Sequence, residues 1–278
     1  MSRPFICCVK KDAVEFIRKK RSLLCGGILL VLSCMVLLMT RCLPPLLETL
    51  AGRATDTVLH TGDISQLMDK LFPQELSGSM GILSADIGVF YSAAIILMCC
   101  RVIPDEIRSG CWVLPLGAGY QRTHLLFSKA LVYSIGTAVP VAVFYNAYYI
   151  CASLFLGGDY TRPSAFVNSL VLGFAVFSIA NLTIVSSALC KSSTLVAATA
   201  LAIVVAAPDL LTYVPFGKLF PTYLLTHVYI SSGHLAALSA PLSITVLLQA
   251  GVYALAAKRL RTQGRLDTVC KSLRRKQR

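Results

Sequence analysis

The sequence predicts an all-α integral membrane protein. Its expected form is six transmembrane helices, an N-terminal amphipathic elbow helix and a re-entrant outer segment before the sixth helix. Two observations come from composition: the 278-residue chain is 56% apolar and only 14% charged, and its mean hydropathy is +0.71. Soluble domains carry roughly 25% charged residues. The third is a set of six apolar stretches, each close to the ~20 residues that cross about 30 Å of hydrocarbon.

The first predicted element is the elbow helix at residues 4–20. One face is apolar and the other charged, at helical spacing. The apolar positions are Phe5, Ile6, Val9, Ala13, Phe16 and Ile17, and the charged ones are Lys10, Lys11, Asp12, Glu15, Arg18 and Lys19. Such a basic amphipathic helix suits the inner membrane interface. It could be a simple juxtamembrane anchor or a helix that contacts a cytoplasmic partner.

The six spans follow in order along one transmembrane domain, residues 1–278. Helices satisfy their own backbone hydrogen bonds within lipid, and these runs are too long and too uniformly apolar for barrel strands. We place the spans at Ser22–Thr40, Ile82–Ile103, Ala130–Leu156, Phe166–Cys190, Thr194–Leu211 and Leu238–Ala257.

Two outer loops are expected, at residues 41–80 and 212–237. Leu43-Pro44-Pro45 predicts the end of the first helix, because proline removes a helical hydrogen bond. Residues 208–234 are moderately apolar but interrupted by proline and glycine, a pattern that favours short helices dipping into the outer leaflet.

Two asparagines and two aspartates within the spans are candidates for specific roles. Asn146 and Asn181 are expected to make interhelical hydrogen bonds. Asp86 and Asp209 are placed near the outer ends of their spans, where solvation at the interface and a role in a transport pathway are both open.

The basic residues set the expected orientation. With a cytoplasmic N-terminus, twenty-one of the 26 Lys and Arg residues lie inside, including nine in the tail at residues 258–278. Cytoplasmic loops carry such an excess in membrane proteins. Both termini are therefore predicted to be cytoplasmic, in a multi-pass protein of the cell (inner) membrane. The net charge of +13 then needs no nucleic-acid partner.

No catalytic or cofactor motif stands out. The sequence lacks a phosphate-binding G-x-x-x-x-G-K-[ST] loop, and its 11 cysteines have no zinc-type spacing. We expect no metal site, no bound cofactor and no enzymatic activity in this chain, and we interpret the cysteines as small apolar fillers.

The cytoplasmic loop at residues 104–129 carries the strongest pattern. Pro104 followed by Asp105 and Glu106 indicates a helix start. Gly110 permits a break, and Gly117 and Gly119 permit a tight turn before the next span. The loop therefore predicts a short helix, a turn and re-entry, which together form a lever at the inner surface.

This loop resembles that of the type-2 exporter permeases, the membrane subunits of bacterial ATP-binding-cassette (ABC) transporters. Their loop has an acid, a glycine, an arginine after a turn and a lysine opening span three. The elbow helix, the six spans and the cytoplasmic termini are similar too. The positions that match or flank the motif are Asp105, Glu106, Arg108, Gly110, Arg122 and Lys129.

The resemblance implies that this chain forms a substrate pathway and that a separate ATPase subunit, holding ATP and Mg²⁺, binds the loop. It also implies a second permease chain, identical or different. We expect a hydrophobic or amphipathic substrate such as an antimicrobial peptide, a drug or a lipid. A stand-alone secondary transporter and a peptide-immunity membrane protein without an ATPase partner are the alternatives.

Overall fold

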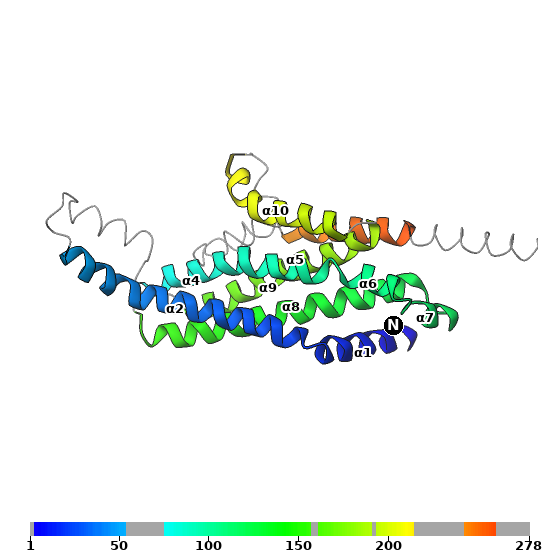
Figure 1. Cartoon of the computed structure of the whole chain (residues 1–278), viewed down its shortest axis with the longest axis horizontal. Coiled ribbons are helices and arrows are strands. Elements are labelled where there is room, and N and C mark those ends of the chain that lie inside the picture. The colour runs from blue at the N-terminus through cyan, green and yellow to red at the C-terminus, as the bar shows by residue number, and fades with distance from the viewer. Residues whose placement is uncertain (1–2, 54–74, 157–160, 191–192, 214–241, 260–278) are drawn as a thin grey trace, which may run out of the picture.

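The computed structural model describes residues 3–53, 75–156, 161–190, 193–213 and 242–259, all of them helical or in short connections (Figure 1). No strand occurs within these ranges. The amphipathic N-terminal segment forms α1 (Arg3–Arg18). The helix that follows is α2 (Arg21–Arg53). Lys20, between them, has a φ of 55°, the left-handed conformation that lets one helix end and the next begin.

The second predicted span is one continuous helix made of three segments, which we call the rod. α4 (Leu76–Asp86) continues without a break into the π-helical turn η1 (Ile87–Tyr91) and then into α5 (Ser92–Cys99). Two short helices follow, α6 (Val102–Arg108) and α7 (Val113–Gly117).

Three longer apolar helices complete the labelled elements. They are α8 (Arg122–Ser153), α9 (Arg162–Leu189) and α10 (Ser193–Tyr213). A further helix occupies residues 242–259. α8 lies at the centre of the bundle, because it packs against α9, α1 and α2.

Four of these helical stretches are long and apolar enough to cross a membrane, as in a multi-pass membrane protein. They are Arg21–Cys42, Leu76–Arg108, Arg122–Ser153 and Arg162–Leu189. The predicted fifth span coincides with α10, of which Ser193–Val204 forms a shorter apolar helix. The predicted sixth span overlaps the helix at residues 242–259. Most of the predicted re-entrant segment and residues 260–278 of the basic tail lie outside the described residues.

Two expectations about helix ends differ from the structure. α2 continues through Pro44 and Pro45 to Arg53, so the predicted break at residues 43–45 is wrong. The prolines remove hydrogen bonds, but the helix on either side is long enough to continue. α8 begins at Arg122, eight residues before the predicted start of the span, because the helix extends beyond its apolar part.

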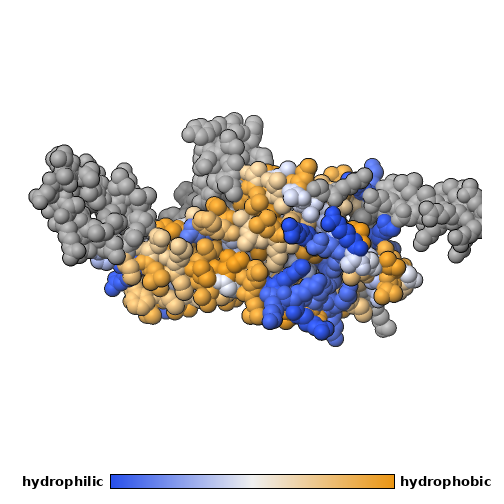
Figure 2. Space-filling view, in the orientation of Figure 1, coloured by the Kyte–Doolittle hydropathy of each residue, from blue (hydrophilic) through white to orange (hydrophobic). Residues whose placement is uncertain are grey.

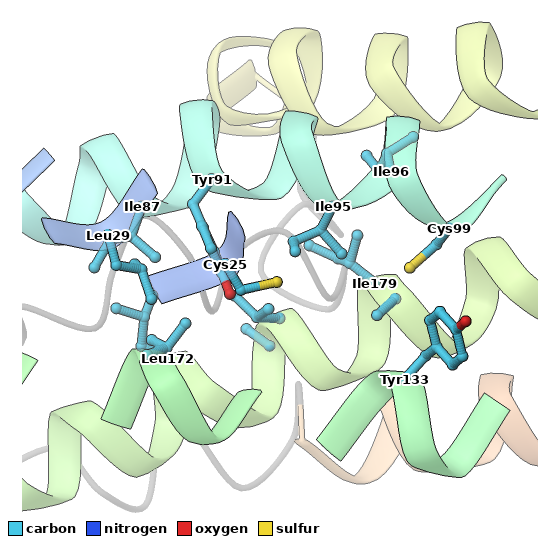
Figure 3. Close-up of a cluster of buried hydrophobic side chains, with 14 of the residues drawn as sticks. Cys25, Leu29, Ile87, Tyr91, Ile95, Ile96, Cys99, Tyr133, Leu172 and Ile179 are labelled. Carbon is cyan, nitrogen blue, oxygen red and sulfur yellow. The ribbon is translucent and has the colours of Figure 1, made fainter. Parts of the chain in front are cut away.

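The core lies among α2, α5, α8 and α9 (Figure 3). Tyr91, Tyr133 and Tyr145 are its largest fully buried side chains. The hydroxyl of Tyr91 donates to the carbonyl of Thr137 at 2.9 Å, so the core is tied together by polar contacts as well as by apolar packing.

The expected interhelical role of the asparagines is confirmed. The Asn146 amide donates to Ser169 Oγ at 2.8 Å, which joins α8 to α9. Asn181 of α9 accepts a hydrogen bond from Tyr253 and donates to Gln249 at 3.5 Å. Such contacts hold helices together in lipid, where hydrophobic burial gives little driving force.

Candidate functional site

The first half of α8 is covered by α1, which runs alongside it in the same direction (Figure 1). The ring of Phe5 meets His124, and the ring of Phe16 meets Tyr133 at 5.1 Å between centroids. A Cβ added to Gly136 would lie 2.7 Å from the Phe16 ring. α1 therefore lies along the first half of α8.

A cluster of charged side chains is buried between α1, α6 and α8. At its centre is Lys129, only 1% exposed. Its ammonium pairs with Glu106 of α6. It also lies 3.4 Å from Glu15 Oε2 and 3.7 Å from Asp12 Oδ1, both on α1. One lysine therefore joins three helices through three carboxylates; we call these four residues the Lys129 cluster.

Neutral donors complete the Lys129 cluster. Ser128 Oγ donates to Asp12 Oδ2 at 2.7 Å. The Trp112 indole donates to Glu106 Oε2 at 3.0 Å. Nearby, Arg21 donates to the Tyr133 hydroxyl, and its guanidinium lies 5.0 Å from the ring centroid. The hydrogen bonds from Ser128 and Trp112 stabilise carboxylates that are buried away from water.

Burial and neighbouring charges shift the pKa values of Asp12 and Glu15, the two carboxyls of α1, in opposite directions. Burial raises the pKa of Asp12, and the charge of Lys129 and the Ser128 hydrogen bond offset this only in part. Burial also acts to raise the pKa of Glu15. There it is outweighed by the hydrogen bond from Lys19 and the charges of Lys129 and Lys19, so the pKa of Glu15 is lowered. Asp12 is the carboxyl of α1 that holds a proton more readily.

The depth of the Lys129 cluster follows from helix geometry. Arg21, where the first span begins, contacts Tyr133. The stretch of α8 from Tyr133 to Ser153 is about 30 Å long, which is the thickness of the hydrocarbon core. α1 and the first turns of α8, including Lys129, thus extend beyond a stretch of α8 that is by itself long enough to cross the hydrocarbon core.

The predicted short helix is α6, and the predicted turns lie at Gly110 and Gly119; α7, between the two turns, was not predicted. We call α6, the turn at Gly110 and α7 the lever. Gly110 and Gly119 have φ of +71° and +86°, so both occupy the left-handed region that glycine adopts without strain. The turn brings Trp112 back onto Glu106. This contact ties the start of α7 to the end of α6.

The tip of the lever is apolar and exposed. Val113 is 69% exposed, and Ile107 and Leu114 are also open. Figure 2 shows hydrophilic colour over the region of α1 and apolar colour again at the end where α7 lies. An apolar patch beyond the hydrophilic band, away from the apolar spans, marks a surface suited to a partner.

The predicted site residues divide into two groups. Glu106 and Lys129 are brought together inside the protein, whereas Asp105 and Arg108 are exposed and Arg122 is half-buried. On α1, Phe16 is buried, Phe5 and Val9 are half-buried, and Ile17 is exposed. Asp12, which the pattern placed on the polar face, is 4% exposed.

Sequence reasoning did not find the Lys129 cluster as a unit. Asp12 lies four residues after Cys8 and four before Phe16, the other buried positions of α1. This spacing was the one signal that could have placed it inward. Trp112, the single tryptophan of the chain, was not recognised as a partner of Glu106.

No described group of three or more His, Cys, Asp and Glu side chains is arranged to hold a metal ion. No protein-family model, curated protein or solved structure matches the chain. The resemblance to the exporter permeases therefore stays a prediction.

Proposed function

We propose that this chain is the permease subunit of an ATP-driven exporter of the ABC type. It would span the cell membrane six times with both termini in the cytoplasm. The observation that carries the proposal is the lever of α6 and α7, which exposes an apolar tip and is anchored to two other helices through buried charge. The partner would be a separate ATPase chain that holds ATP and Mg²⁺.

The ATPase docks on the tip formed by Ile107, Val113 and Leu114, whose apolar side chains are exposed. The charges of Asp105 and Arg108 flank this surface and set the orientation of the partner, as rim charges do at interfaces. Glu106 is not available for docking, because it is paired with Lys129 and Trp112.

Motion reaches the membrane through the Lys129 cluster. A displacement of α6 pulls on Lys129 of α8, and Lys129 is joined to Glu15 and Asp12 of α1. ATP shifts the population only if it binds one arrangement of the ATPases better than the other. Two permease chains, moved together, would then open and close the pathway for an apolar or amphipathic substrate.

The test compares one substitution at two exposed valines. Val113→Asp puts a charge on the tip, whereas Val14→Asp puts the same charge on α1, where Val14 is 47% exposed. The tagged chain is purified from its native membranes in mild detergents, and the ATPase subunit is quantified by mass spectrometry. We expect a stoichiometric ATPase with the unaltered chain and with Val14→Asp, and a loss of about ten-fold or more with Val113→Asp.

Two outcomes contradict parts of this proposal separately. Equal ATPase recovery with both variants would remove the docking surface from α7 but leave the permease. Absence of any ATPase from the unaltered chain, under several detergents, would remove the exporter itself. The stand-alone transporter and the peptide-immunity protein would then be the functions to pursue.

A further inference from the structure

The rod of α4, η1 and α5 contains an irregular turn next to an acid. η1 is a π-helical turn at Ile87–Tyr91, and Asp86 is the residue directly before it. Single π-turns within α-helices are rare and frequently occur at functional sites. The Tyr91 hydroxyl donates to the carbonyl of Thr137, which holds Tyr91 in the core while Phe90, its neighbour, is 60% exposed.

Asp86 lies within the membrane thickness. It is fifteen residues from Arg101, the first charged residue that follows it, or roughly 22 Å at 1.5 Å per residue. The hydrocarbon core is about 30 Å thick. With Arg101 at the inner boundary, Asp86 lies inside the outer half of the bilayer, near the outer end of its span as the sequence pattern predicts.

The carboxyl of Asp86 is partly exposed. Among the described residues, no hydrogen bond or ion pair to Asp86 is found. Acidic side chains within spans are rare, face a bundle interior or an aqueous cavity, and mark substrate or ion pathways.

The predicted spans offer no cation for this acid. Apart from Arg101 at the inner end of the second span, the six predicted spans contain no Lys, Arg or His. Lys129, just beyond the third, is already shared by three carboxylates. The spans of a second copy contain the same residues and therefore add no cation.

We propose that Asp86 and Phe90 bind the cationic group of an organic cation with an apolar body, such as an alkylammonium or a basic amphipathic peptide. The carboxylate supplies the opposite charge. The exposed ring of Phe90, about one turn further along, supplies an aromatic face for the same group. This names the substrate class of the proposed exporter and in that respect rests on the proposed function.

The test uses two probes of nearly the same shape and opposite charge, tetraphenylphosphonium and tetraphenylborate. The full-length chain is placed in phosphatidylcholine nanodiscs, and binding is measured by equilibrium dialysis against protein-free nanodiscs. Neutral lipid is chosen because anionic lipid would itself attract the phosphonium. No ATPase is needed, so the result does not depend on the docking surface of α7.

Three variants probe the carboxylate. Asp86→Asn should weaken phosphonium binding about ten-fold or more, and Asp86→Glu should retain most of it. Glu75→Gln removes a carboxylate charge from an exposed position before α4 and should change nothing. Borate binding, which reports on the apolar surface, should be the same or slightly stronger in Asp86→Asn.

Two further variants probe the ring. Phe90→Leu should weaken phosphonium binding about three-fold, whereas Phe90→Tyr should not. The proposal is overturned if the unaltered chain binds no more phosphonium than empty nanodiscs, or if Asp86→Asn binds it equally well. A matching loss of borate binding would also overturn it, because the loss would then come from misfolding. Phosphonium binding without any ATPase partner would leave Asp86 as a cation site in a stand-alone transporter.

Discussion

Two regions of this protein have opposite charge imbalances. Between α1, α6 and α8, one ammonium, that of Lys129, is surrounded by three carboxylates. Within the second span, the carboxyl of Asp86 has no described cation. The first imbalance is satisfied inside the fold by hydrogen bonds from Ser128 and Trp112, whereas the second is open. A buried charge with partners holds helices together, and an open one is available to a ligand.

The largest effect is expected from removing the shared cation. Lys129→Met removes the cation shared by Glu106, Asp12 and Glu15, of which only Glu15 keeps another salt bridge among the described residues, to Lys19. Breaking a buried pair in this way costs about 3–5 kcal/mol. Thermal unfolding of the purified chain in detergent measures the loss. Lys10→Met, at an exposed position of α1, is the control and should change stability by about 0.5 kcal/mol or less. Equal stability of the two variants would show that the Lys129 cluster does not hold the helices.

The next effect tests whether close packing brings the Lys129 cluster together. Gly136→Ala places a methyl group against the Phe16 ring and should cost about 1–3 kcal/mol by overpacking. Gly27→Ala is the matched control, because nothing lies within 4 Å of the added Cβ and alanine favours the helix. If both variants unfold at the same temperature as the unaltered chain, α1 does not approach α8 this closely.

A smaller effect concerns protons. Because the pKa of Asp12 is raised in the folded state, the folded chain binds a proton more tightly than the unfolded chain. Stability then falls as the pH rises from the usual pKa of an aspartate to the raised one. Lys129, Lys11 and Ser128 favour the ionised form, and Glu15 opposes it. Asp12→Asn should remove this decline, and the exposed Asp105→Asn should not; unfolding curves across pH 4–7 measure both.

The smallest effect on stability is expected at the open acid. Asp86→Asn removes no described interaction and should shift unfolding by about 1 kcal/mol or less, in either direction, under the conditions used for Lys129→Met. A loss as large as that of Lys129→Met would mean that Asp86 is a structural group after all, and the contrast between the two regions would disappear.

Much of the fold could be predicted, because the length of an apolar stretch and the positions of glycine and proline determine helices and turns locally. Within the described residues the apolar runs are helical. The loop after the second span forms the predicted short helix and turns, together with α7, which was not predicted. The path of α2 through Pro44 and Pro45 could not be predicted. The local sequence shows the cost of two prolines in a helix, but it does not show that the helix continues on both sides of them.

The candidate site was predicted only in part. Glu106 and Lys129 were singled out as separate residues, but their pairing depends on how α6 packs beside α8. Asp12 was assigned to solvent because a charged residue on an amphipathic helix normally faces water. Its burial depends on a lysine 117 positions later in the chain, a relation that no local pattern contains.

The π-turn also has a genetic consequence. A π-turn is an α-helix that contains one residue too many, so deleting the single codon for Gly88 within Ile87–Tyr91 would restore a regular helix without shortening the span below the bilayer. Asp86 would then be turned by about 100° relative to α5. A mutation as small as a three-nucleotide deletion could thus re-aim the acid while every side chain near it stayed the same.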